Sequence, residues 1–376
     1  MKKICIILSI IITCYMIIPA YSFAEDYDGV KSYVLIESST GTVIDEKNPS
    51  QKLNVGYLSK LMSLLLIAED IETGKYRLST ELTASQSVTD TKGSVIWLES
   101  GDTMTVEELL KAVIIGNAND AMTVLAEKSE QSIENFVNRM NTEAFDMGLR
   151  NTAFYSPYGY YDEREYTTAY DMAVICSHLV KFEFLQEYFK TWRDFVKEGK
   201  TELVNENTLS RTYERHIGFK ACHSEQSGYC IAEAGRNESG ICYIAVVLGA
   251  ENDDIMLKSA KKLVNKGFSE YKLTATMFPD EMLMPIKVKN GTDSAVEIHL
   301  KNQCNLVVPR GVSELSTVVV IPEYLTAPCK EGQKIGTAGF YSEKNLVCEI
   351  DIVTSESMNE LTFGFVFEKT LLNMLK

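Results

Sequence analysis

Residues 53–62 read LNVGYLSKLM and introduce a helical pattern of apolar residues that ends at Gly74. The apolar positions of this pattern are Leu61, Leu64, Leu65, Ala68 and Ile71. Apolar residues three and four apart, closed by a glycine, predict one face of a buried helix. Tyr57 and Lys60 are three apart, so in a helix that begins near Tyr57 their side chains leave the same face. The stretch therefore predicts a helix that presents a tyrosine beside a lysine.

The segments around this helix alternate in a way that indicates the fold class. Residues 33–37 and 42–46 are rich in β-forming residues and flank a polar turn, which predicts a hairpin. Thr105 and Glu108 form a capping box that opens a second helix, and helical patterns continue to Gly148. Residues 219–248 are again strand-like, with a second hairpin predicted around residues 235–240, and residues 256–268 read as a closing helix. Strands first, helices in the middle and strands last predict an α+β fold with helices packed on an antiparallel sheet.

The N-terminus has the pattern of a secretory signal. Lys2 and Lys3 precede an apolar run over residues 4–20, and small residues stand at Ser22 and Ala24. This pattern predicts a signal peptide over residues 1–24. An uncleaved membrane anchor is the alternative, because the apolar run is only slightly short of a span. Both interpretations place the mature protein outside the cytoplasm, secreted or at the outer face of the cell membrane.

Charge and cysteine content limit the partners. The formal net charge is −15 at pH 7, and an acidic surface argues against nucleic acid and against a polybasic lipid footprint. The nine cysteines show no Cys-x-x-Cys spacing, so no metal site is expected, and no cofactor is indicated. Seven cysteines follow residue 24, an odd number that leaves at least one thiol unpaired within the chain. We expect mostly reduced and buried thiols.

The character of the sequence changes after Phe268. Prolines punctuate short alternating runs such as residues 286–289 and 296–300, which predict a small β-rich domain over residues 273–358. Residues 359–376 form an apolar tail with few basic residues. This tail is a candidate for a helix on a membrane surface, and a dimer or intramolecular contact is the alternative.

Many segments resemble, in order, the D-alanyl-D-alanine carboxypeptidases, which are low-molecular-mass penicillin-binding proteins of the serine peptidase class. The resemblance runs from about residue 33 to residue 268 and includes residues 119–121 (NDA), 148–152 (GLRNT), 166–173 (YTTAYDMA) and 245–250 (AVVLGA). It implies a β-lactamase/transpeptidase-like domain over residues 25–272. Residues 325–353 resemble the C-terminal β domain that many of these enzymes carry.

The family's catalytic motifs are altered at their hydroxyl groups. The Ser-x-x-Lys motif supplies a nucleophilic serine and a general-base lysine, and these positions are Tyr57 and Lys60 here. The Ser-x-Asn motif relays a proton and holds the substrate amide, and it reads Asn117, Ala118, Asn119. The resemblance therefore implies that Lys60 and Asn119 are retained while both hydroxyl groups are lost.

The substrate-binding motif is altered as well. The family's Lys-Thr-Gly motif lies on a strand beside the substrate, where the lysine and threonine hold the terminal carboxylate and the glycine admits the ligand closely. Here it reads Lys220, Ala221, Cys222. Arg236 resembles the family's further carboxylate partner. The resemblance thus implies a cationic cleft in which Lys60, Asn119 and Lys220 converge and the Tyr57 hydroxyl bonds to Lys60 or Asn119.

Three other residues are candidates to replace the missing nucleophile: Ser59, Cys222 and Ser259. Ser59 adjoins Lys60, but neighbouring residues on a helix point about 100° apart. Cys222 shares a strand face with Lys220, whose charge can lower a thiol pKa, whereas His223 points to the opposite face. Ser259 and Lys262 also spell the motif, but within a late helix without supporting residues.

Three functions follow as hypotheses. The first is a catalytically inactive homologue that binds a peptidoglycan stem peptide or a cell-wall enzyme. The second is an active serine-type carboxypeptidase with altered motifs. The third is a structural extracytoplasmic scaffold in which the cleft is closed.

Overall fold

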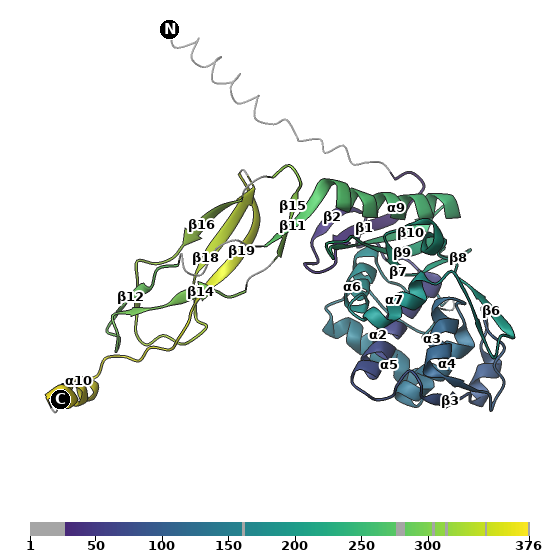
Figure 1. The fold of residues 1–376 in the computed structure, drawn as a ribbon, viewed down its shortest axis with the longest axis horizontal. Coiled ribbons are helices and arrows are strands. Elements are labelled where there is room, and N and C mark those ends of the chain that lie inside the picture. The colour runs from purple at the N-terminus through teal and green to yellow at the C-terminus, as the bar shows by residue number, and fades with distance from the viewer. Residues whose placement is uncertain are drawn as a thin grey trace, which may run out of the picture.

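The computed structural model describes residues 27–159, 162–275, 283–302, 305–312, 315–342 and 344–374. The signal peptide expected over residues 1–24 lies outside the described residues. Figure 1 shows an elongated molecule, in which a larger body of helices and sheet is followed by a β-rich part and the short helix α10.

A six-stranded sheet organises the larger body, with strand order β2-β1-β10-β9-β7 and with β8 paired to β9. The strands are β1 Ser32–Glu37, β2 Val43–Lys47, β7 His216–Gly218, β8 Ala221–Ser224, β9 Gly228–Arg236 and β10 Cys242–Ala250. All their pairings are antiparallel. The two predicted hairpins are confirmed as β1–β2 and β9–β10.

The central strands are buried on both faces. Along β1, Val34 and Ile36 join the core shared with the helices of the middle of the chain, whereas Tyr33 and Leu35 join the core beneath α9. Alternate side chains of a strand point to opposite faces, so one strand serves two cores. Helix α9, Asp253–Glu270, covers one face of the sheet, and the helices between residues 60 and 190 cover the other (Figure 1).

The helices on the other face begin with the one predicted from residues 53–74. They are α2 Lys60–Glu72, α3 Val106–Ile114, α4 Asn119–Glu130, α5 Ile133–Asp146, α6 Ala169–Leu179 and α7 Glu183–Lys190. The short α8, Leu209–Thr212, instead packs Leu209 into the core beneath α9. Two ribbons flank them, β3 Glu81–Thr83 with β4 Thr103–Thr105, and β5 Arg193–Val196 with β6 Thr201–Val204. The predicted capping box is confirmed, since Thr105 and Glu108 bond each other's backbone at the start of α3. The α+β fold class is confirmed.

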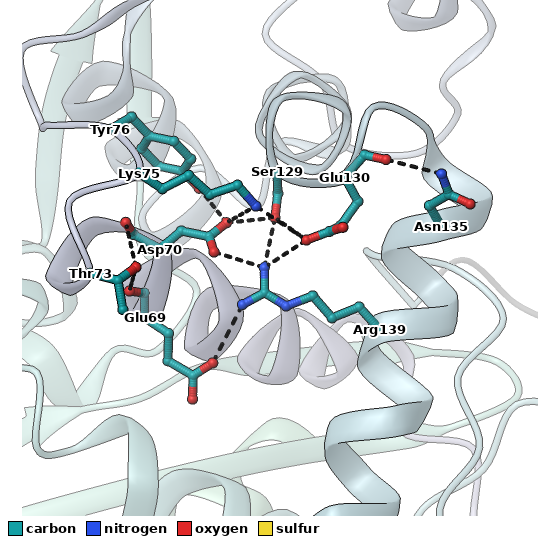
Figure 2. Close-up of polar contacts among 9 residues, drawn as sticks. All are labelled: Glu69, Asp70, Thr73, Lys75, Tyr76, Ser129, Glu130, Asn135 and Arg139. Atoms are coloured by element: carbon teal, nitrogen blue, oxygen red, sulfur yellow. Dashed lines mark hydrogen bonds and ion pairs between the residues drawn. The ribbon is translucent and has the colours of Figure 1, made fainter.

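A polar network ties α2, α4 and α5 together (Figure 2). Asp70 is largely buried, and one of its oxygens lies 2.8 Å from Arg139 Nη1. Its other oxygen accepts hydrogen bonds from Ser129 at 2.6 Å and from Tyr76 at 3.2 Å. Arg139 also lies 3.0 Å from Glu130. One guanidinium group from α5 thus links carboxylates on two other helices.

The C-terminal part is built of short strands around its own core. They are β11 Tyr271–Ala275, β12 Ile286–Lys289, β13 Ala295–Val296, β14 Ile298–Leu300, β15 Asn305–Pro309, β16 Ser316–Val320, β17 Tyr324–Thr326, β18 Lys334–Ser342 and β19 Asn345–Thr354. The boundary expected between residues 272 and 273 falls inside β11, which pairs with β15. The pairings are antiparallel except for β12 with β17, which run parallel. The small all-β domain that we predicted is confirmed, with this one parallel pairing.

Helix α10, Phe363–Met374, ends the described chain with its apolar side chains exposed. Phe363, Phe367, Leu371 and Met374 all face solvent. Among the described residues, we find no helix with the length and apolar character needed to cross a membrane.

Candidate functional site

Tyr57 and Lys60 meet at the start of α2. Tyr57 lies in a short 3-10 turn over Gly56–Ser59, and α2 begins at Lys60. The ammonium nitrogen of Lys60 lies 4.0 Å from the centroid of the Tyr57 ring. Lys60 is fully buried, and its Nζ has no hydrogen-bond partner in the described part of the chain. The tyrosine ring therefore occupies the place beside the lysine where a nucleophile would have to lie.

The Tyr57 hydroxyl is directed toward Asn119. Burial raises the pKa of Tyr57, while hydrogen bonds with the Ser94 backbone and the Asn119 side chain act in the opposite direction. A methyl group added at Gly93 would lie 2.6 Å from this hydroxyl and 2.7 Å from Asn119 Nδ2. The backbone of Gly93, at φ +90°, thus packs directly on the tyrosine. We expected the hydroxyl to bond Lys60 or Asn119; it reaches Asn119, and Lys60 contacts the ring instead.

The two asparagines are buried, and Asn119 is held by the protein itself. Asn119 begins α4, and its Nδ2 donates to the Lys92 carbonyl at 2.6 Å. Asn117 adopts φ +59° in the loop before α4. The side-chain oxygens of Asn117 and Asn119 have no hydrogen-bond partner among the described residues. The Asn119 nitrogen that could hold a substrate carbonyl is therefore bonded to the loop that packs on Tyr57.

Lys220 caps the C-terminus of helix α3. Its Nζ donates to the carbonyl oxygens of Val113 at 3.0 Å and Ile114 at 2.7 Å, the last residues of α3. A cation at a helix C-terminus satisfies carbonyls that the helix leaves unpaired and complements the helix dipole. Burial lowers the pKa of Lys220 to about 8. The lysine that the resemblance assigned to a substrate carboxylate thus bonds the backbone.

Lys60 and Lys220 share one electrostatic environment. Burial, followed by the nearby charge of Lys220, holds the pKa of Lys60 well below its ordinary value. The carboxylate of Glu206 acts in the opposite direction on both lysines. The structure therefore brings Lys60, Lys220 and Asn119 together around Tyr57.

Cys222 belongs to the same cluster, whereas Ala221 does not. The Cys222 thiol is buried and donates to the Val55 carbonyl at 3.3 Å, and burial raises its pKa. A thiol that stays protonated is a poor nucleophile. Ala221 points to the opposite face of the sheet, into the core beneath α9. His223 is exposed and stacks on Tyr229 with the ring centroids 5.1 Å apart.

Arg236 lies further along β9 than the residues that pair with β8. Ala221 pairs with Ile231 of β9, and Arg236 stands five residues further along that strand. At the usual rise of a strand this separation is about 16 Å. Arg236 lies beside α7 instead, 3.4 Å from the Gln186 side-chain oxygen and 3.6 Å from Glu183.

Ser59 faces away from Lys60, toward a buried carboxyl group. Its hydroxyl donates to Glu165 Oε1 at 2.6 Å. Burial raises the pKa of Glu165 to about 7. Glu165, Glu206 and the Gly93 loop were not singled out in the sequence, because only the tertiary fold brings them to residues 57–60.

A small cavity remains beside the tyrosine. It measures about 260 Å³ and is lined by Asn54, Gly56, Tyr57, Gly159, His223, Ser224 and Gln226. Its polar members carry amide, hydroxyl and imidazole groups. Within the described part of the chain, no group of three His, Cys, Asp or Glu side chains could hold a metal ion.

Comparison with known proteins bears directly on this site. Residues 24–252 match the family model described as D-alanyl-D-alanine carboxypeptidase, which covers more than half of the chain. The chain belongs to the D-alanyl-D-alanine carboxypeptidase family. Residues 271–360 of this family member match the model described as penicillin-binding protein 5, C-terminal domain.

Individual relatives of this carboxypeptidase homologue match along most of their length. The D-alanyl-D-alanine carboxypeptidase DacF of Bacillus subtilis (strain 168) is 31% identical over 346 residues, which cover 91% of this chain and 89% of DacF. DacC of Escherichia coli (strain K12) is 28% identical over 339 residues, covering 88% of this chain and 84% of DacC. The structure of penicillin binding protein 5 from Haemophilus influenzae superposes with a TM-score of 0.82 at 24% identity, covering 88% of this chain and 98% of that one. Homology thus connects the chain to D-Ala-D-Ala carboxypeptidases of cell-wall metabolism.

Proposed function

We propose that this protein is a catalytically inactive D-Ala-D-Ala carboxypeptidase homologue that binds peptidoglycan stem peptide without cleaving it, outside the cytoplasm. One observation carries the proposal: the base-position lysine, Lys60, is buried against the ring of Tyr57 at 4.0 Å. Acyl transfer needs a nucleophile within hydrogen-bond reach of its base. Lys60 has no such partner among the described residues.

Neither substitute restores a nucleophile. The Ser59 hydroxyl is bonded to Glu165, and the Cys222 thiol is protonated and bonded to the Val55 carbonyl. In the serine protease subtilisin, loss of the nucleophile alone costs about six powers of ten in turnover. Retained lysines and an asparagine do not recover a loss of that size.

The cavity beside Tyr57 supports peptide binding. Asn54, Ser224 and Gln226 offer donors and acceptors at its wall, and His223 is exposed. A peptide backbone requires neutral donors and acceptors of this kind. The volume of about 260 Å³ is at or below the small end of ligand pockets, so we expect weak binding.

A structural scaffold is the second candidate, and a separate observation favours it. The Lys220 ammonium group and the Asn119 amide, which the family resemblance assigned to substrate, donate to Ile114 and Lys92.

The test measures binding and cleavage on the same samples. A stem pentapeptide ending in D-Ala-D-Ala is titrated calorimetrically into the purified protein, and free D-alanine is assayed after prolonged incubation. We expect weak saturable binding, its loss in a His223→Ala, Ser224→Ala variant, and no released D-alanine. His178→Ala, which removes a histidine on α6 outside this cavity, serves as the matched control.

The outcomes separate the three hypotheses. Absence of binding to the pentapeptide would contradict stem-peptide binding and favour the scaffold. Release of D-alanine in proportion to enzyme concentration would contradict inactivity and favour the active carboxypeptidase.

A further inference from the structure

The outer face of α9 carries a cationic groove. A surface cavity of about 600 Å³ runs along this helix. Its cationic lining residues are Arg215, Lys258, Lys261, Lys262 and Lys266, against one acidic residue, Glu270. The chain as a whole has a formal charge of −15, so this concentration of positive charge is local and opposite to the average.

The four lysines form one stripe on the helix. Lys261, Lys262 and Lys266 follow Lys258 by three, four and eight residues, which places all four along one side of an α-helix. From Lys258 to Lys266 the stripe is about 12 Å long. An extended row of positive charges suits a linear anion better than a single small one.

Aromatic rings support three of these cations from below. Arg215 Cζ lies 5.0 Å from the Phe268 ring centroid. Lys261 Nζ lies 5.4 Å from the Tyr213 centroid, and Lys262 Nζ lies 4.9 Å from the Tyr27 centroid. Cation–π contact restricts long side chains that would otherwise lose conformational entropy on binding a ligand.

Acidic side chains pair with Lys258 and Lys266 of the groove. Lys266 lies 2.7 Å from Asp45 in a largely buried ion pair. Lys258 lies 2.6 Å from Asp254, but both side chains are exposed, and exposed pairs contribute little free energy. The cationic groups of Arg215, Lys258, Lys261 and Lys262 also line the groove.

We infer that this groove binds a linear phosphodiester polymer of the cell envelope. Lysine and arginine are suited to phosphate oxygens, and their spacing along α9 matches a chain of repeated anionic groups. The site is independent of the Tyr57 cleft, because α9 covers the opposite face of the sheet.

Two other polyanions fit less well. An anionic membrane is disfavoured because the exposed apolar helix α10 lies at the other end of the elongated molecule, far from α9 (Figure 1). Single-stranded nucleic acid is bound through bases stacked on aromatic rings. Here Phe268, Tyr213 and Tyr27 are buried beneath the cations.

The test uses the full mature chain and poly(glycerol phosphate) as the probe, with affinity measured at low and physiological salt. We expect saturable binding that weakens as salt rises. Lys258→Glu combined with Lys262→Glu should weaken it by about tenfold or more. The matched control, Lys128→Glu with Lys200→Glu, changes the net charge equally at exposed lysines outside the groove and should bind like the unmodified protein.

Thermal unfolding of both double variants checks that the fold is retained, and the exposed positions chosen make this the expected result. Absence of binding, or equal losses in the two double variants, would overturn the proposal. Tighter binding to single-stranded DNA than to poly(glycerol phosphate) would overturn it in favour of nucleic acid. Loss of binding to phosphatidylglycerol vesicles in the α9 variant, without loss of polymer binding, would overturn it in favour of a membrane.

Discussion

Burial and the nearby charge of Lys220 lower the pKa of Lys60, and the contact with the Tyr57 ring acts against them. A desolvated cation–π contact contributes about 2 kcal/mol. Taking an ammonium ion out of water costs several kcal/mol, and Lys220 adds a second positive charge nearby. The ring therefore offsets only part of the cost, which is why the pKa of Lys60 is lowered.

This imbalance predicts the effect of removing the charge. The pKa of Lys60 is lower in the folded state than in the unfolded state. The free energy of unfolding is therefore highest above about pH 10.4, where the lysine is neutral in both states, and it falls as the pH falls through the folded-state pKa. Lys60→Met should therefore raise the free energy of unfolding at pH 7 by about 1–3 kcal/mol. The difference in the free energy of unfolding between Lys60→Met and the unmodified protein, measured by urea denaturation, should be smaller at pH 10 than at pH 7.

Lys220→Met is the matched comparison, and it should act in the opposite direction. Removing this lysine leaves the Val113 and Ile114 carbonyls at the end of α3 without their donor. We expect a loss of about 1–3 kcal/mol. A Lys60→Met protein less stable than the unmodified chain at pH 7 would contradict this interpretation of the two lysines.

Restoring the nucleophile alone should not restore activity. Tyr57→Ser supplies a hydroxyl, but position 117, where the family motif has a serine, is still an asparagine, and catalytic residues act as a unit. We expect no D-alanine release from this variant. The variant that also carries Asn117→Ser, Ala221→Thr and Cys222→Gly should release more D-alanine than Tyr57→Ser. Equal release of D-alanine by the single and the fourfold variant would refute the argument.

At the scale of elements, the network around Asp70 ties α2, α4 and α5 together near the C-terminal ends of α2 and α4. Arg139→Ala removes the guanidinium that faces Asp70, Glu130 and Glu69, leaving Asp70 largely buried with fewer partners. Breaking a buried pair costs about 3–5 kcal/mol, and Lys75 remains 3.4 Å from Asp70. We therefore expect a loss of about 2–4 kcal/mol in chemical denaturation.

Arg150→Ala is the control for this prediction. Arg150 lies over the Phe145 ring at the surface, so its removal should change the free energy of unfolding by less than about 0.5 kcal/mol. Equal stability of the Arg139→Ala and Arg150→Ala proteins would show that the network does not stabilise the bundle.

Elements with local sequence signals were predictable, and those that depend on tertiary contacts were not. The capping box at Thr105 and the hairpins follow from residues close in the chain. The closing helix begins at Asp253, earlier than expected, because the Asn252 side chain caps it by accepting from the Ile255 backbone.

The same distinction explains the candidate site. Lys60, Asn119 and Lys220 were found through the motif spacing of a family, and the fold brings them together. Sequence order did not reveal how far along β9 Arg236 stands from the residues that pair with β8. Glu165 could not be found, since its contact with Ser59 joins residues 106 positions apart.

At the scale of the whole molecule, helix α10 suggests how the protein attaches to a membrane surface. Helix α10 exposes Phe363 and Phe367, whose rings stack 6.3 Å apart, and Leu371. We predict that deleting residues 361–376 abolishes sedimentation with phosphatidylglycerol vesicles and leaves the midpoint of thermal unfolding unchanged. Vesicle binding that survives the deletion would contradict a membrane role for α10, and a change from dimer to monomer would assign it to self-association.

Covalent labelling by a fluorescent penicillin, read by intact-mass spectrometry, tests the central claim most directly. Penicillin binding protein 5 from Haemophilus influenzae is the positive control. The arrangement of Tyr57, Lys60 and Cys222 predicts that the unmodified protein keeps its mass while the control gains one adduct. An acyl adduct on any residue of this protein would contradict the account, and the peptide that carries it would name the nucleophile.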